Sequence, residues 1–198
     1  METVDKVVID SPLSEEDIQK RKTRKPMMVV GMVAIVMMFA GFTSAYIISQ
    51  SNGNWLTFAL PKTFYVSTAI LLVSSVTLRV STSAVKKNDF SKVKSGLGLT
   101  FLLSIAFVVT QFVAYGNMIE DGYYFTGTNV SASYLYILTF LHLLHVVGGI
   151  IALLVSWVKS LENKYTANNK LGLELTAMYW HFLDALWIYL LLFLLFIR

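Results

Sequence analysis

The sequence predicts an all-α membrane protein, a bundle of five transmembrane helices with the N-terminus in the cytoplasm and the C-terminus in the periplasm. Three observations support this fold class: an apolar composition, five long apolar stretches and an uneven distribution of basic residues. Of the 198 residues, 56% are hydrophobic and 14% are charged, and the mean hydropathy is +0.62. Because a soluble domain carries about 25% charged residues, this composition excludes an ordinary soluble globular fold.

Each of the five apolar stretches is close to the roughly 20 residues that a helix needs to cross about 30 Å of hydrocarbon. They are residues 27–48, 64–84, 95–118, 133–158 and 175–197. Arg79 interrupts the second stretch, but a long arginine side chain near a helix end extends its charge to the headgroups. The chain therefore divides into a polar cytoplasmic tail, residues 1–26, and a five-helix transmembrane domain, residues 27–198.

The basic residues indicate the orientation of the helices. Of the 16 Lys and Arg residues, all except Lys62 and Arg198 lie in the tail, around the second connection or in the fourth connection. Such positively charged segments are retained on the cytoplasmic side of the membrane. The net charge of +4 is dispersed along the chain and forms no basic domain, so we expect no nucleic-acid binding.

The sequence contains no recognisable motif for catalysis or cofactor binding. It has no cysteine, which excludes disulfides, thiolate metal sites and iron–sulfur clusters. It also contains no phosphate-binding glycine-rich loop, no H-E-x-x-H metal motif and no serine nucleophile elbow. We therefore predict no catalytic residue, no cofactor-binding residue and no metal ligand in this chain.

Four polar side chains lie at membrane depth. His142 and His145 are three residues apart on the fourth span, as are His181 and Asp184 on the fifth, so each pair shares a helix face. At about 1.5 Å per residue, His145 lies roughly 18 Å below the outer end of its helix and Asp184 roughly 14 Å above the inner end of its own, which allows a contact between them. Interhelical pairing, a proton relay and a metal site are the three interpretations of this set. We favour interhelical pairing, because one acid and three histidines supply few ligands for a metal ion.

Other residues are expected to join helices. We expect Gln111, on the third span, to hydrogen-bond a neighbouring helix, the alternative being a contact with a quinone or substrate. Gly41 with Ala45, and Gly148 with Ala152, place small residues four positions apart. This spacing allows two helices to approach closely.

Three sequence motifs carry a resemblance to a known family. The fifth span contains Tyr179-Trp-His-Phe-Leu-Asp-Ala-Leu-Trp187, which is similar to a Y-W-H-F-[VL]-D-x-x-W signature. The fourth span contains His142-Leu-Leu-His-Val-Val-Gly-Gly149, which resembles an H-x-x-H-V-x-x-G element, and the first contains Phe39-Ala-Gly41 followed by Ala45-Tyr46. From about residue 27 to the C-terminus, the chain resembles subunit III of the haem–copper cytochrome c and quinol oxidases, in its short five-helix bacterial form.

The chain departs from this family at two positions. Ile35 stands where the family usually has a membrane-buried glutamate before the Phe-Ala-Gly motif, and Ala114 replaces the acid of a Q-x-x-E-[YW] element that begins here at Gln111. The proton-antenna role of those glutamates is therefore not carried over to this chain.

The resemblance implies a non-catalytic accessory subunit of a proton-pumping terminal oxidase in aerobic respiration, located in the bacterial inner membrane. Its main partner would be the catalytic subunit I, with subunit II, small subunits or a respiratory supercomplex as further partners. Haem and copper would reside in the partner subunits, and membrane phospholipid would be the ligand available to this chain. The electron donor, cytochrome c or quinol, stays open. The alternatives are an accessory protein of a nitric oxide reductase and a small membrane transporter.

Overall fold

The computed structural model describes residues 15–51, 55, 60–126, 129–162, 165 and 170–197. These residues form five α-helices, each long and apolar enough to cross a membrane. The helices are α1 (Glu15–Ser49), α2 (Thr63–Lys86), α3 (Phe90–Glu120), α4 (Val130–Leu161) and α5 (Leu171–Phe196). The prediction of an all-helical protein with five spans is confirmed, and each predicted span coincides with one helix.

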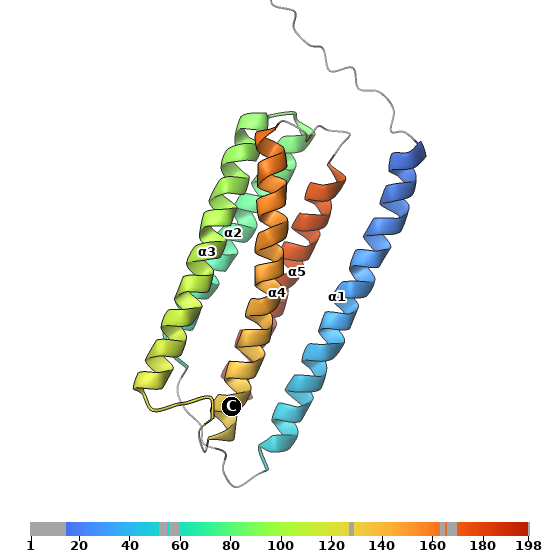
Figure 1. Ribbon diagram of the computed structural model, residues 1–198. Coiled ribbons are helices and arrows are strands. Elements are labelled where there is room, and N and C mark those ends of the chain that lie inside the picture. Colours follow the sequence, from blue (N-terminus) through green and yellow to red (C-terminus); the bar gives the residue numbers. More distant parts are fainter. Residues whose placement is uncertain are drawn as a thin grey trace, which may run out of the picture.

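The helices α2 to α5 form a four-helix bundle, and α1 lies along its outside (Figure 1). Within the bundle, each helix packs against its neighbour in the chain, and α2 also packs against α5. Among the described residues, α1 approaches only α4 and α5. One long side of α1 is therefore free of other helices of this chain, and apolar residues such as Val30 and Met37 are exposed on it.

The first helix begins well before the predicted span. Residues 1–14 of the predicted tail lie outside the described residues, whereas residues 15–26 continue α1 and include Pro26 within the helix. Helical structure persists here because the segment has a partner: Lys25 Nζ and Arg21 Nη1 lie 2.7 and 3.7 Å from Glu174 Oε2 at the start of α5. The change from polar to apolar residues marks the edge of the span, and it does not mark the start of the helix.

The closest pair of helices is α2 with α3. Their buried positions alternate at spacings of three and four residues, the pattern of a helix–helix seam. Ser67, Ser74 and Ser81 recur at every seventh position of α2 and are fully buried, and small side chains of this kind let two backbones approach. Gly96 of α3 lies so close to this row that an added Cβ would collide with the Ser81 hydroxyl.

A tight turn joins these two helices. Asn88 has φ of 53°, a left-handed conformation that asparagine tolerates better than most residues. The Asp89 side chain then caps α3 by accepting a hydrogen bond from the Lys92 backbone N–H at 3.2 Å, which satisfies a donor left free at the helix start. Hydrogen bonding and attraction to Lys92 lower the pKa of Asp89.

A substitution at Gly96 tests the close approach of α2 and α3. Gly96→Leu should lower the free energy of unfolding by about 1–3 kcal/mol, because the larger side chain overpacks the seam. The matched control is Gly116→Leu on the same helix, where no atom lies within 4 Å of an added Cβ. Thermal unfolding in detergent measures both variants, and equal midpoints would contradict the packing described here.

A buried polar seam as the candidate functional site

The polar residues of the fifth helix meet hydroxyl groups of the second. We call this contact the α2–α5 polar seam and define it as Thr68, Ser74 and Ser75 of α2 with Trp180, His181, Asp184 and Trp187 of α5. Trp180, Asp184 and Trp187 are four and three positions apart, and His181 is three positions before Asp184, so they lie toward the side of α5 that packs against α2. The seam thus contains four residues of the Tyr179–Trp187 motif.

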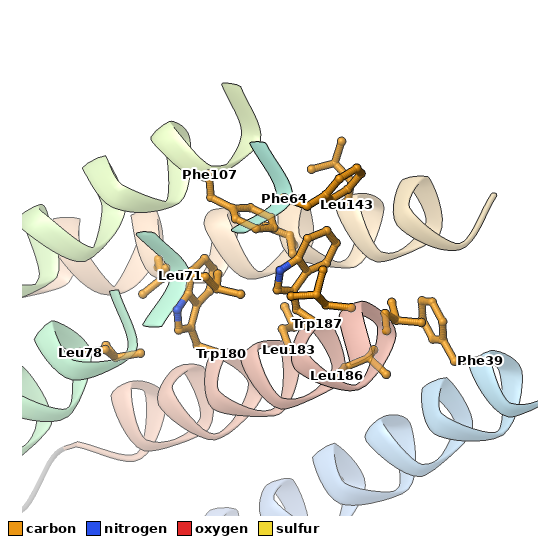
Figure 2. Close-up of a cluster of buried hydrophobic side chains, with 14 of the residues drawn as sticks. Phe39, Phe64, Leu71, Leu78, Phe107, Leu143, Trp180, Leu183, Leu186 and Trp187 are labelled. Carbon is orange, nitrogen blue, oxygen red and sulfur yellow. The ribbon is translucent and has the colours of Figure 1, made fainter. Parts of the chain in front are cut away.

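Two tryptophans form the framework of the seam. Trp180 and Trp187 are each 1% exposed, and both project from α5 into the cluster of buried side chains (Figure 2). The Trp180 indole donates a hydrogen bond to Ser74 Oγ at 3.1 Å, and the Trp187 indole donates one to Thr68 Oγ1 at 2.9 Å. The rings also fill volume: Trp187 packs edge-on against Phe107 of α3, with ring centres 5.2 Å apart.

His181 and Asp184 lie beside each other within the seam. His181 Nδ1 is 2.8 Å from Ser75 Oγ and 3.6 Å from Asp184 Oδ2. Asp184 is 5% exposed, whereas the His181 side chain is 31% exposed and lines a cavity at the end of the bundle. The histidine therefore links the buried carboxyl group to the surface of the protein.

The contact between His145 and Asp184 that the depth estimate allowed is not formed, because Asp184 lies beside His181 on its own helix. His145 Nδ1 instead donates to the Leu141 carbonyl oxygen at 2.7 Å, and its ring meets Phe39 of α1 edge-on at 5.8 Å. The Tyr179 hydroxyl donates to the backbone carbonyl of His145 at 3.2 Å. His145 is thus half-buried where α1, α4 and α5 meet.

His142 is fully buried and is packed as an aromatic ring. Its ring centre lies 5.1 Å from that of Trp187 and 6.3 Å from that of Phe107. Neither ring nitrogen has a hydrogen-bond partner among the described residues.

Gln111 of α3 is also buried. Its side chain donates a hydrogen bond to Ser67 Oγ of α2 at 2.9 Å. Gln111 therefore joins α3 to a neighbouring helix.

The small residues chosen from the sequence do not mark the close contacts inside this chain. Gly41 has no atom within 4 Å of an added Cβ, and at Gly148 the nearest is the Tyr179 hydroxyl at 3.9 Å. The close approach of α4 to α5 occurs at Gly149, where a Cβ would lie 3.1 Å from both Leu183 and Trp180. The motif residues Trp180 and Leu183 need this glycine, because their side chains occupy the space beside it.

The side chains of this site form hydrogen bonds between helices. Among the described residues, no three His, Cys, Asp or Glu side chains gather to hold a metal ion. His181 lies beside Asp184 and also lines the cavity at the end of the bundle. The indole and hydroxyl groups of the seam are paired with one another and hold two helices together.

Sequence reasoning missed the α2 half of the seam. Thr68, Ser74 and Ser75 are small polar residues that look unremarkable one by one, and we did not select any of them. For Ser74 the available signal was periodicity: Ser67, Ser74 and Ser81 are seven residues apart, a repeat that places them on one face of a helix. Thr68 and Ser75 lie outside this repeat. A face of serines within an apolar span predicts a partner helix with hydrogen-bonding side chains.

The comparisons with known proteins agree on one protein family. Residues 25–197 match the family model described as cytochrome c oxidase subunit III. A protein of Nocardia farcinica named "Probable cytochrome c oxidase subunit 3" is 31% identical over 172 residues, which cover 81% of each chain. Proteins named "Cytochrome c oxidase subunit 3" are 30% identical in Corynebacterium diphtheriae, over 83% of this chain and 85% of the relative, and 32% identical in Synechocystis, over 82% and 70%.

The unpaired ring of His142 leads to a prediction. His142→Phe should change the free energy of unfolding by less than about 1 kcal/mol, because it removes polar atoms that have no partner. Trp187→Phe, in the same cluster, should be clearly destabilising, since it breaks the bond to Thr68 and empties volume. Chemical or thermal unfolding in detergent measures both. Equal destabilisation by the two variants would indicate that the His142 nitrogens are hydrogen-bonded in the membrane.

Proposed function

Because the chain belongs to the cytochrome c oxidase subunit III family, we propose that it is a non-catalytic accessory subunit of a haem–copper terminal oxidase. It is a multi-pass protein of the bacterial inner membrane. Its role is to stabilise the catalytic subunit I during aerobic electron transport. The observation that carries this proposal is the family match over residues 25–197, which includes almost the whole membrane domain.

The arrangement of the motif residues supports a structural role. Trp180, Trp187 and Gln111 are buried and bonded to hydroxyl groups of α2. A substrate or redox partner could not reach these groups without separating the helices. We therefore interpret His142, His145, His181 and Asp184 as residues that stabilise the bundle or its contact with subunit I.

Subunit I is the main partner that we propose, with subunit II and small subunits as further neighbours. Gly41 of α1 and Gly148 of α4 are exposed in this chain and have little packed against them. Together with Ala45 and Ala152, they offer small surfaces on which a helix of another subunit could pack closely. Haem and copper belong, in this proposal, to the partner subunits.

The alternatives are less well supported. The relatives described above carry the name of an oxidase subunit, which does not favour a nitric oxide reductase accessory protein or a transporter.

The distribution of basic residues supports a cytoplasmic N-terminus and a periplasmic C-terminus.

Purification from the native membrane tests the proposal. The tagged chain should be isolated in mild detergent and examined by visible spectroscopy and by mass spectrometry of the proteins that accompany it. We expect haem absorption bands together with oxidase subunits I and II. A colourless protein isolated without these subunits would contradict the proposal.

The stabilising role leads to a specific expectation for Asp184. Asp184→Ala should reduce the amount of assembled oxidase and shorten its half-life more than it reduces initial turnover per haem, because it leaves His181 without its neighbouring acid. Two further variants are compared with Asp184→Ala. Asp184→Asn keeps the size of the side chain, and Leu192→Ala is the control at an exposed position of the same helix. Haem content and oxygen consumption are measured over time. Normal assembly and durability of the Asp184→Ala complex would contradict a stabilising role.

A further inference from the structure

The first helix is attached to the bundle at two separate places. Its C-terminal half carries three buried side chains, Phe39, Thr43 and Tyr46. Among the described residues, no side chain of α1 before Phe39 is buried. Near its N-terminal end, α1 is held by the ion pairs to Glu174 of α5. The two attachments are independent of each other, because the part of the helix between them buries no side chain.

The attachment at the N-terminal end is electrostatic. Arg21 and Lys25 are four residues apart, so both lie on one face of α1 and reach the same carboxylate. The side chains of Arg21, Lys25 and Glu174 are 22%, 40% and 28% exposed. Ion pairs of this exposure contribute little to stability and weaken as salt is added. The contact can therefore open and close without unfolding of the bundle.

Pro26 follows this contact directly and lies inside α1. It lacks the backbone N–H that would donate to the Lys22 carbonyl, so the helix is weakened at this turn. The helical conformation of Lys25 is also disfavoured, because it precedes a proline. From Met27 onward, α1 is apolar and belongs to the membrane-spanning part. A bend at Pro26 would move residues 15–25 through water and leave the spanning part in place.

The same contact borders a cavity of about 390 Å³, at the end of the bundle where α1 and α5 begin (Figure 1). Lys25 and Glu174 line this cavity. His181 also lines it, and its Nδ1 lies 3.6 Å from Asp184 Oδ2. The ion pair between Lys25 and Glu174 is thus part of the cavity wall. Movement of Lys25 away from α5 would open a path from water to His181.

We propose that residues 15–25 of α1 form a strap that controls the access of water and solutes to the His181–Asp184 pair. Glu174 holds the strap closed, and Pro26 is its hinge. The half of α1 that contains Phe39 stays in place when the strap opens. The inference goes beyond the accessory role, because it assigns a conformational change to this chain whichever partner subunits surround it.

Labelling of histidines with diethyl pyrocarbonate tests the proposal on the full-length chain in its native membrane. The reagent modifies accessible imidazole rings, and mass spectrometry of peptides gives a rate for each histidine. Glu174→Gln removes both ion pairs. At about a factor of two to five for each pair of this exposure, His181 should be modified roughly 4 to 25 times faster than in the wild type. Glu15→Gln is the matched control, because it makes the same change at an exposed acid of the strap outside both ion pairs. It should behave like the wild type.

Two further variants test the ion pairs and the hinge separately. Reversal of all three charges, Glu174→Lys with Arg21→Glu and Lys25→Glu, should restore slow labelling of His181, because opposite charges again face each other. Pro26→Ala should slow the labelling below the wild-type rate, because it supplies the missing backbone donor. Added salt should accelerate labelling in the wild type and have little effect in Glu174→Gln, where no ion pair remains to be screened.

His145 is the internal reference, because its ring contacts Phe39 in the half of α1 that stays in place. Faster labelling of His181 at an unchanged His145 rate supports the strap. Equal His181 rates in Glu174→Gln and the wild type would overturn it, and so would a parallel rise at His145, which would mean that the whole of α1 detaches. The haem spectrum of the same membranes reports separately on the oxidase complex, so failure of the strap is distinguishable from failure of the accessory role.

Discussion

The interior of a membrane supplies no water, so every polar side chain placed there needs a partner within the protein. In this chain the indole and hydroxyl groups between α2 and α5 meet that constraint, whereas the ring nitrogens of His142 and the carboxyl oxygens of Asp184 have no hydrogen-bond partner among the described residues. The indoles of Trp180 and Trp187 donate to hydroxyl groups of α2, and His181 lies within hydrogen-bonding distance of Ser75. These bonds fix the relative height and rotation of the two helices, because a shift along either axis would leave several polar groups unpaired at once.

The serine row of α2 has a second consequence. Because Ser67, Ser74 and Ser81 are small, α3 packs directly against α2, and Gln111 reaches Ser67. The helix α2 thus contacts two neighbours. Its hydroxyl groups hydrogen-bond side chains of α5, and its small serine side chains allow α3 to approach closely. By contrast, α1 is joined to the bundle mainly through α5 and α4 and through the ion pairs to Glu174. It is the helix whose surface is most available to another subunit.

An accessory role is consistent with this distribution of polar groups. Trp180 and Trp187 of the Tyr179–Trp187 motif are used to hold α5 against α2.

The number of helices, their approximate limits and the burial of Gln111, His142 and Asp184 follow from the order of the residues alone, because the length of an apolar stretch and the cost of exposing a polar group to lipid are local properties. The contact of Asp184 with His181 is indicated by their three-residue spacing on α5. The contacts between helices are not, because spacing along one helix does not show that Ser75 of α2 meets His181, or that His145 bonds its own helix and not Asp184. Likewise, Gly96 and Gly149 are required at close contacts while Gly41 is exposed. A glycine's role depends on what packs beside it, and that is fixed only when all five helices assemble.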